Sequence, residues 1–186
     1  MSRASQVIIL CEDKLHRTFV TLFLKQYGYR EHDFRIEQAA PSKGAAEHFV
    51  RHRCPVLLKT YRSRIPKTFL IAVIDADVGS VHGHEQELRK ACEQQSVPVR
   101  QDEDKVVHVI PRRAINTWLA SLQGVEVDEG TDYKGRGYKF QECESNIAPL
   151  VRKLHEACVR GEAPTNAPPS LTHACREFAR IKDELR

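Results

Sequence analysis

The segment Thr68-Phe-Leu-Ile-Ala-Val-Ile-Asp-Ala-Asp-Val-Gly-Ser80 decides how this chain is expected to fold. Residues 69–74 form an unbroken run of apolar and β-branched side chains, which is typical of a strand buried on both faces within a parallel sheet. Asp75 and Asp77 follow where this strand ends. Because alternate side chains of an extended segment lie on the same side, both carboxylates are expected to point into the crevice at the carboxyl end of the sheet.

Two neighbouring carboxylates repel each other unless a cation lies between them. Mg2+ accepts oxygen ligands and usually takes one or two protein carboxylates while it keeps waters for the substrate. The Asp75–Asp77 pair therefore indicates a divalent metal site. The alternative is that these two residues form a polar turn with Gly79 and Ser80 and simply close the strand.

The chain before this segment repeats the pattern of a strand followed by a helix. Residues 6–11 are a second continuous apolar run, which ends at Glu12 and Asp13. Apolar residues then recur at helical spacing over 14–26, and residues 33–39 alternate in a way that predicts a strand near an edge. A further helix is predicted over 45–64, with a break at Pro55.

The chain after the segment continues the alternation. We predict a surface helix over 84–95, a strand over 105–110 and a helix over 114–122, in which Trp118 faces the core. Four strand-and-helix alternations predict an α/β fold with a four-stranded, mainly parallel sheet and helices on both faces. The predicted domain spans residues 1–124, and residues 125–186 form a loop and a helical C-terminal extension packed on it, with Ser170 capping the last helix.

Composition fits a folded domain and excludes several protein classes. A chain of 186 residues with 41% hydrophobic and 29% charged residues is large enough for one full-sized domain. No apolar run is long enough to cross a membrane, and the first residues have no targeting core, so a cytoplasmic location without membrane attachment is expected. The net charge of +4 is too small to identify a partner.

The six cysteines are scattered and include no Cys-x-x-Cys pair. Neither a zinc-binding motif nor a disulfide framework is expected from this spacing, and reduced, mostly buried thiols fit it better. The residues concerned are Cys11, Cys54, Cys92, Cys143, Cys158 and Cys175.

In a doubly wound sheet, Glu12 would meet the Asp pair at the carboxyl ends of the first and third strands. The alternative for Glu12 is a simple interaction with the positive end of the following helix dipole. A strand ending in Glu, followed later by a strand ending in Asp-x-Asp, resembles the Toprim domain of topoisomerases, bacterial primases and the nuclease half of overcoming-lysogenisation-defect proteins. The resemblance is carried by Val7-Ile-Ile-Leu-Cys-Glu12 and Leu70-Ile-Ala-Val-Ile-Asp-Ala-Asp77 and covers about residues 6–124.

The resemblance implies a catalytic site in which Glu12, Asp75 and Asp77 hold Mg2+ or Mn2+, with Glu12 as a metal ligand or general acid/base for phosphodiester cleavage. Two metal ions can stabilise both the attacking and the leaving oxygen of such a reaction. The family usually places Gly after the glutamate, whereas Asp13 and Lys14 follow here. Asp13 is then either an additional ligand or a sign that the site has diverged.

Cationic side chains near the same edge are candidates for binding nucleic acid. Arg112 and Arg113 follow the fourth strand, and arginine matches the geometry of phosphate. A loop with Lys134 and Arg136 combines cations with tyrosines, and Lys14 follows the first strand. His82 and His84 are interpreted as loop residues near the site, with phosphate contact and plain solvation as the alternatives.

The function expected from these features is that of a metal-dependent, Toprim-type nuclease acting on DNA or RNA. Stand-alone chains of this kind resemble effectors of bacterial antiviral defence that pair with an ABC-type ATPase. Because this chain has no phosphate-binding Gly-x-x-x-x-Gly-Lys-Ser/Thr motif of its own, such an ATPase would be a separate protein. One alternative is a catalytically inactive Toprim-like module that binds a partner protein. Another is a haloacid-dehalogenase-like phosphatase, although its Asp pair normally closes the first strand rather than the third.

Overall fold

The computed structural model describes residues 6–40, 46–63, 68–136 and 144–185. Its centre is a four-stranded sheet in which every neighbouring pair of strands is parallel. The strand order is β2-β1-β3-β4. The bounds are β1 (Gln6–Cys11), β2 (Phe34–Gln38), β3 (Thr68–Val73) and β4 (Val106–Val109). The predicted α/β fold is confirmed, and β2 is an edge strand as its alternating sequence indicated.

The helices follow the predicted order, with differences at particular residues. Their bounds are α1 (Lys14–Lys25), α2 (Ala46–Ser63), α3 (Val81–Gln94), α4 (Ile115–Leu122), α5 (Glu144–Arg160), α6 (Pro169–Arg180) and α7 (Lys182–Leu185), with a short 3-10 turn η1 (Glu31–Asp33) before β2. The predicted break at Pro55 is wrong, because α2 runs through it. Burial of the neighbouring Cys54, Leu57 and Leu58 offsets the one backbone hydrogen bond that a proline removes.

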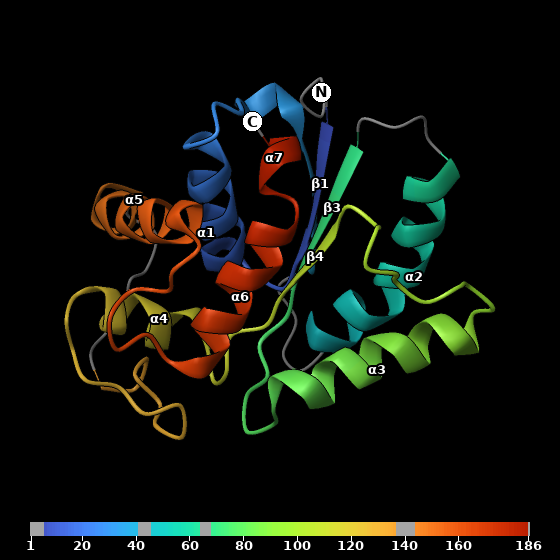
Figure 1. Ribbon diagram of the computed structural model, residues 1–186. Helices are drawn as coiled ribbons and strands as arrows, with labels where there is room; N and C mark the ends of the chain where they lie inside the picture. The colour runs from blue at the N-terminus through green and yellow to red at the C-terminus, as the bar shows by residue number, and fades with distance from the viewer. Residues whose placement is uncertain (1–5, 41–45, 64–67, 137–143, 186) are drawn as a thin grey trace.

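The helices form one layer on each side of the sheet (Figure 1). The α2 and α3 helices cover one face, where Leu57 and Leu88 pack against Leu70 and Ile74 of the central strand segment. The α1, α4, α5 and α6 helices cover the other face, where Phe23, Trp118 and Phe178 belong to a larger hydrophobic core. Both faces of β3 are therefore buried, and all six of its residues are inaccessible to solvent or nearly so.

The order of the strands places a topological switch point between β1 and β3. These strands are neighbours, but the helix after β1 lies on one face of the sheet and the helix after β3 lies on the other (Figure 1). Ligands of open α/β sheets bind in the crevice that such a reversal opens at the carboxyl ends of the strands. Glu12 directly follows β1, and Asp75 comes two residues after the end of β3.

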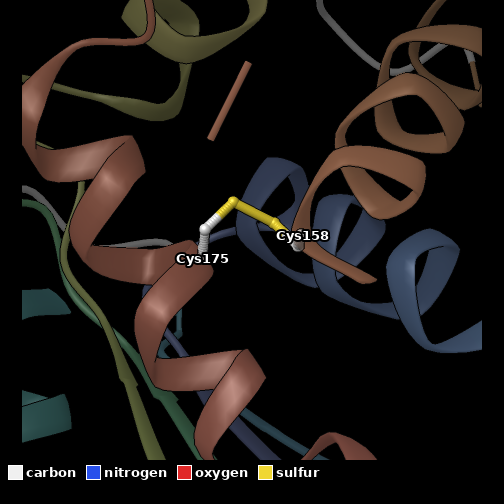
Figure 2. The surroundings of a disulfide bond; sticks show 2 residues. All are labelled: Cys158 and Cys175. Carbon is white, nitrogen blue, oxygen red and sulfur yellow. A yellow bond between two sulfur atoms is a disulfide. The ribbon is translucent and has the colours of Figure 1, made fainter. Parts of the chain in front are cut away.

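The two long C-terminal helices are joined by a disulfide between Cys158 of α5 and Cys175 of α6 (Figure 2). The expectation of reduced thiols is therefore wrong for this pair. The Cα atoms lie 5.0 Å apart because α5 and α6 pack against each other, which the spacing of cysteines along the sequence does not reveal. Cys11, Cys54 and Cys92 are free and buried as expected, and Cys143 lies outside the described residues.

Ser170 has a different role from the predicted helix cap. The α6 helix begins at Pro169 with Pro168 in the cap position, and the Ser170 side chain makes no capping hydrogen bond. Its buried Oγ instead accepts hydrogen bonds from Trp118 Nε1 at 2.7 Å and from the Arg112 backbone N–H at 3.2 Å. Trp118 lies in the core as predicted, and Ser170 satisfies its indole N–H.

Candidate active site

Glu12 and Asp75 meet at the switch point of the sheet. The Asp75 backbone N–H donates a hydrogen bond of 2.6 Å to Glu12 Oε1, although the two residues are 63 positions apart in the sequence. This contact follows from the register of the sheet, because Cys11 at the end of β1 pairs with Val73 at the end of β3. In this register Glu12 comes opposite Ile74, and Asp75 follows one position later at the same edge of the sheet.

Asp77 departs from the extended geometry assumed for the Asp pair. The β3 strand ends at Val73, and Asp77 has a φ of 42° in the left-handed region. The Asp77 carbonyl accepts a 3.1 Å hydrogen bond from the Arg113 N–H, which fixes this turn. The expectation that both aspartates project from one side of a continuing strand is therefore wrong. Asp77 is exposed, whereas the Asp75 side chain is only 17% exposed.

His16 is a member of the site that the sequence pattern did not identify. It lies on α1 one helical turn after Glu12, its side chain is 1% exposed, and its Nε2 lies 2.9 Å from Asp75 Oδ1. Burial lowers the pKa of His16, but the charges of Asp75, Asp13 and Glu12 outweigh burial and raise this pKa to about 9. The imidazolium therefore compensates part of the negative charge of the site at neutral pH.

The pKa values of the two carboxyl groups are raised as well, which for an acid favours the uncharged form. Burial raises the pKa of Glu12 to about 7, with further increases from the charges of Asp75 and Asp77 and a decrease from His16. Burial also raises the pKa of Asp75, against the effect of His16. A carboxyl group with a pKa near 7 exchanges a proton close to neutral pH, which suits a general acid/base.

A cavity of about 270 Å³ opens beside Asp75. Its polar wall is formed by the starts of α1 and α4 and by the 128–136 loop, through Asp13, Lys14, His16, Asp75, Asn116 and Lys134. Asn116 was not identified from the sequence, because a single buried Asn on an apolar helix carries no recognisable pattern. The cavity combines carboxylate, imidazole, amide and ammonium groups in a space of small-ligand size.

The remaining predicted residues lie at different distances from this cavity. Asp13 is the N-cap of α1, where its Oδ1 accepts the His16 N–H at 2.8 Å, so a structural role accounts for the extra acid. Lys14 and Lys134 are exposed and line the cavity. Arg112 and Arg136 are exposed outside its lining, and Arg113 Nε donates to the Gly130 carbonyl at 3.0 Å.

A separate polar cluster involves one of the two predicted loop histidines. His82 and His84 belong to α3 rather than to a loop, because Ser80 caps this helix by accepting the Gly83 N–H at 3.0 Å. His84 is buried against Glu47 and Glu87. Within the described ranges, this is the one group of three potential metal-binding side chains whose ligand atoms all lie within 4.8 Å of one another. The carboxylate oxygens of Glu12, Asp75 and Asp77 are therefore not gathered within that distance.

No protein-family model, no curated protein and no solved structure matches this chain. The Toprim resemblance therefore stays a prediction from the sequence. Across the described part of the chain, no helix is both long and apolar enough to cross a membrane.

Proposed function

We propose that the protein is a divalent-metal-dependent phosphodiesterase of Toprim type that cleaves DNA or RNA at the Glu12–Asp75 site. The observation that carries this proposal is the encounter of Glu12 and Asp75 at the switch point of the sheet, beside the cavity described above. Acids at this place in an open parallel sheet are positioned for a bound ligand rather than for the stability of the sheet.

The donor set suits Mg2+ or Mn2+ in type and number. Both ions prefer oxygen ligands, and Mg2+ usually takes one or two carboxylates and completes its shell with water. Glu12 and Asp75 supply such a pair, and Asp77 is close enough to raise the pKa of both. Because the three carboxylates are not gathered together, we assign Asp77 to the outer part of the site, toward the substrate. A bound divalent ion would polarise the phosphate and activate a water molecule.

The side chains around the cavity suit a phosphodiester substrate. Lys14 and Lys134 line it from two segments and can contact the phosphate on either side of the cleaved bond. Glu12 serves either as the second metal ligand or, with its pKa near neutrality, as the proton-transfer group. Arg112, Arg113 and Arg136 lie outside the cavity lining and are candidates for contacts with neighbouring phosphates.

The test is cleavage of plasmid DNA, single-stranded DNA and RNA in Mg2+, Mn2+ or EDTA. We expect cleavage only with a divalent ion, and a decrease of at least about a hundredfold for Glu12→Gln and Asp75→Asn. Lys134→Ala should raise KM more than it lowers kcat, because it removes a phosphate contact away from the metal. Glu93→Gln, an exposed change on α3, is the matched control. Unaltered cleavage in Asp75→Asn would exclude this site.

A second candidate function is a catalytically inactive Toprim-like module that binds a partner protein, and the His16–Asp75 ion pair favours it. The buried His16 imidazolium compensates the negative charge of Asp75 without a metal ion. Such an ion pair would stabilise a site that no longer catalyses a reaction. A separate ABC-type ATPase is the partner that the resemblance implies. Absence of cleavage in every divalent ion, together with formation of a stable complex with such an ATPase, would favour this alternative.

A further inference from the structure

A second cluster of metal-ligand side chains lies between α2 and α3, outside the candidate active site. Glu47 comes from the first turn of α2, and His84 and Glu87 come from successive turns of α3. His84 Nε2 lies 3.2 Å from Glu47 Oε1, and His84 Nδ1 lies 3.6 Å from Glu87 Oε2. The three side chains bring one potential ligand atom each within 4.8 Å of the others.

The buried His84 Nε2 has no hydrogen-bond partner, and Glu87 Oε2 has only ion-pair contacts, with Arg51 and His84 Nδ1. The His84 side chain is 10% exposed, and neither its Nε2 nor Glu87 Oε2 has a partner with hydrogen-bond geometry. His84 Nε2 and Glu47 Oε1 are therefore close without being aligned as donor and acceptor. Two ligands of a tetrahedral Zn2+ ion, at bond lengths of about 2.0–2.1 Å, lie roughly 3.3 Å apart, which is close to the separation of these two atoms.

Arg51 shows that the cluster accommodates a positive charge. Its Nη2 lies 2.9 Å from Glu47 Oε1 and its Nη1 lies 3.0 Å from Glu87 Oε2, so one guanidinium spans both carboxylates. Its side chain is 30% exposed and lies next to solvent. A divalent ion that used the same two oxygens would replace this guanidinium, which could turn outward without leaving a buried charge unpaired.

We propose that Glu47, His84 and Glu87 form a binding site for a transition-metal ion of the Zn2+ class, with Arg51 as the competing cation. One imidazole nitrogen and two carboxylate oxygens are ligands that Zn2+ accepts, and the fourth position would be left to water. The imidazole suits this class of ion better than Mg2+, which prefers oxygen. This proposal does not depend on the proposed nuclease function.

The site would connect the metal to the segment that carries Asp77. A Cβ atom built on Gly79 would lie only 3.2 Å from His84 Cε1, so the imidazole packs directly against the backbone of the turn after β3. Fixing His84 with a metal would join α2, α3 and this turn. The metal is therefore expected to order the turn rather than to take part in cleavage.

The test is calorimetric titration of Zn2+ into EDTA-treated protein that carries Glu12→Gln and Asp75→Asn, which removes the acids of the candidate active site. We expect one equivalent to bind. Adding His84→Gln or Glu47→Gln should weaken binding by at least about tenfold. Adding Arg51→Met should tighten it, because the competing cation is removed. The control changes are His82→Gln, at the exposed histidine two positions away, and Glu93→Gln, which should leave binding unchanged.

The proposal is overturned if zinc binding is unaffected by His84→Gln, or if no zinc binds with or without Arg51→Met. X-ray absorption of the zinc-loaded protein with intact Glu47, His84 and Glu87 provides a measurement that does not require a destabilising change. One imidazole nitrogen with oxygen ligands supports the site. Two or more imidazoles indicate binding at surface histidines instead and contradict it. If the X-ray absorption spectrum of the bound zinc is the same with and without Glu12→Gln and Asp75→Asn, the zinc site is separate from the candidate active site.

Discussion

The buried environment of Glu12 gives a pH dependence of stability that can be measured. Its pKa in the folded protein is raised from 4.5 to about 7 by burial and by its acidic neighbours. Between these values the folded protein retains a proton that the unfolded chain releases, so the free energy of unfolding falls as the pH rises from about 4.5 through 7.

The matching substitution is Glu12→Gln, which keeps the hydrogen-bond acceptor for the Asp75 N–H and removes the titration. In urea denaturation with EDTA, the free energy of unfolding of the wild-type protein should fall by about 2 kcal/mol more than that of Glu12→Gln between pH 5 and pH 8. A metal ion would supply the missing positive charge, so Mg2+ should reduce the difference. Equal losses in both proteins would show that Glu12 ionises normally.

Ser170 gives a prediction about stability at the scale of a single hydroxyl group. Its Oγ accepts from both Trp118 Nε1 and the Arg112 N–H. Ser170→Ala should therefore lower the free energy of unfolding by about 1–3 kcal/mol, because the indole N–H loses its acceptor inside the core. Ser63→Ala, at an exposed serine, should change it by less than about 0.5 kcal/mol. Chemical denaturation followed by Trp118 fluorescence measures both.

The residues found and missed by sequence reasoning differ in whether their role is local. Glu12 and Asp75 could be located because each follows a continuous apolar strand, and parallel strands end at a common edge. His16 and Asn116 could not, because their importance comes from burial against other segments. The backbone of Asp77 could not be predicted either, since the left-handed turn is stabilised by Arg113, 36 positions later in the sequence.

At the scale of elements, the disulfide joins two helices that the sequence treats as separate. Cys158 and Cys175 are 17 positions apart, with the end of α5, a loop and the start of α6 between them. Closing a loop of this size stabilises the folded chain by about 3 kcal/mol in the chain-entropy model. Reduction should lower the free energy of unfolding by that order.

The experiment compares urea denaturation of the wild-type protein with and without a phosphine reductant. The double variant Cys158→Ser/Cys175→Ser should resemble the reduced wild-type protein and should not respond to the reductant. Cys92→Ser, at a free buried cysteine, controls for loss of a thiol without a crosslink. A wild-type protein indifferent to the reductant would contradict a stabilising role for this bond.

The elements were predictable where periodicity is strong and less so where side chains from elsewhere decide. The four strands and the order of the helices follow from apolar runs and helical spacing. Pro55 and Ser170 were misjudged for one common reason. Local rules place a break at a buried proline and a cap at a serine, whereas packing on the sheet and the need of Trp118 for an acceptor determined the outcome.

At the scale of the whole molecule, acid should destabilise the protein through His108 of β4. Burial, together with the nearby Arg100, lowers its pKa from 6.5 to about 3, although Glu177 acts in the opposite direction. Below pH 6.5 the unfolded chain therefore binds a proton that the folded protein does not bind. The free energy of unfolding falls as the pH falls from 6.5 toward 3. Glu177, whose pKa is lowered by its hydrogen bonds to Arg100 and the His108 N–H despite burial, acts in the same direction.

The corresponding variant is His108→Gln, which is polar and does not titrate. Between pH 7 and pH 4, the free energy of unfolding of the wild-type protein in urea denaturation should fall by about 2–3 kcal/mol more than that of this variant. His32→Gln, at a histidine whose side chain is 73% exposed, is the control and should follow the wild-type curve. An unchanged acid slope in His108→Gln would show that this histidine is protonated in the folded state.

The opposing effects of Glu12 and His108 both contribute to the pH profile of the metal-free protein, and the raised pKa of His16 adds to the loss at alkaline pH. Glu12 lowers the free energy of unfolding as the pH rises from 4.5 to about 7, and His108 lowers it as the pH falls from 6.5 to about 3. These two effects therefore offset each other between about pH 4.5 and 6.5, and stability should fall on either side of that range. Glu12 follows β1 and His108 lies on β4, and β3 separates these two strands by about 9–10 Å. At that separation, effects without shared partners add to within about 0.5 kcal/mol.

The double variant Glu12→Gln/His108→Gln should therefore have a flatter profile, with the acid arm of one single variant and the alkaline arm of the other. A deviation from additivity larger than about 0.5 kcal/mol would mean that the two sites communicate through β3. Because Asp75 comes two residues after β3, such coupling would link the acid-sensitive side of the sheet to the candidate active site. Repeating the profile with Mg2+ would separate the cases, since metal should raise only the arm that depends on Glu12.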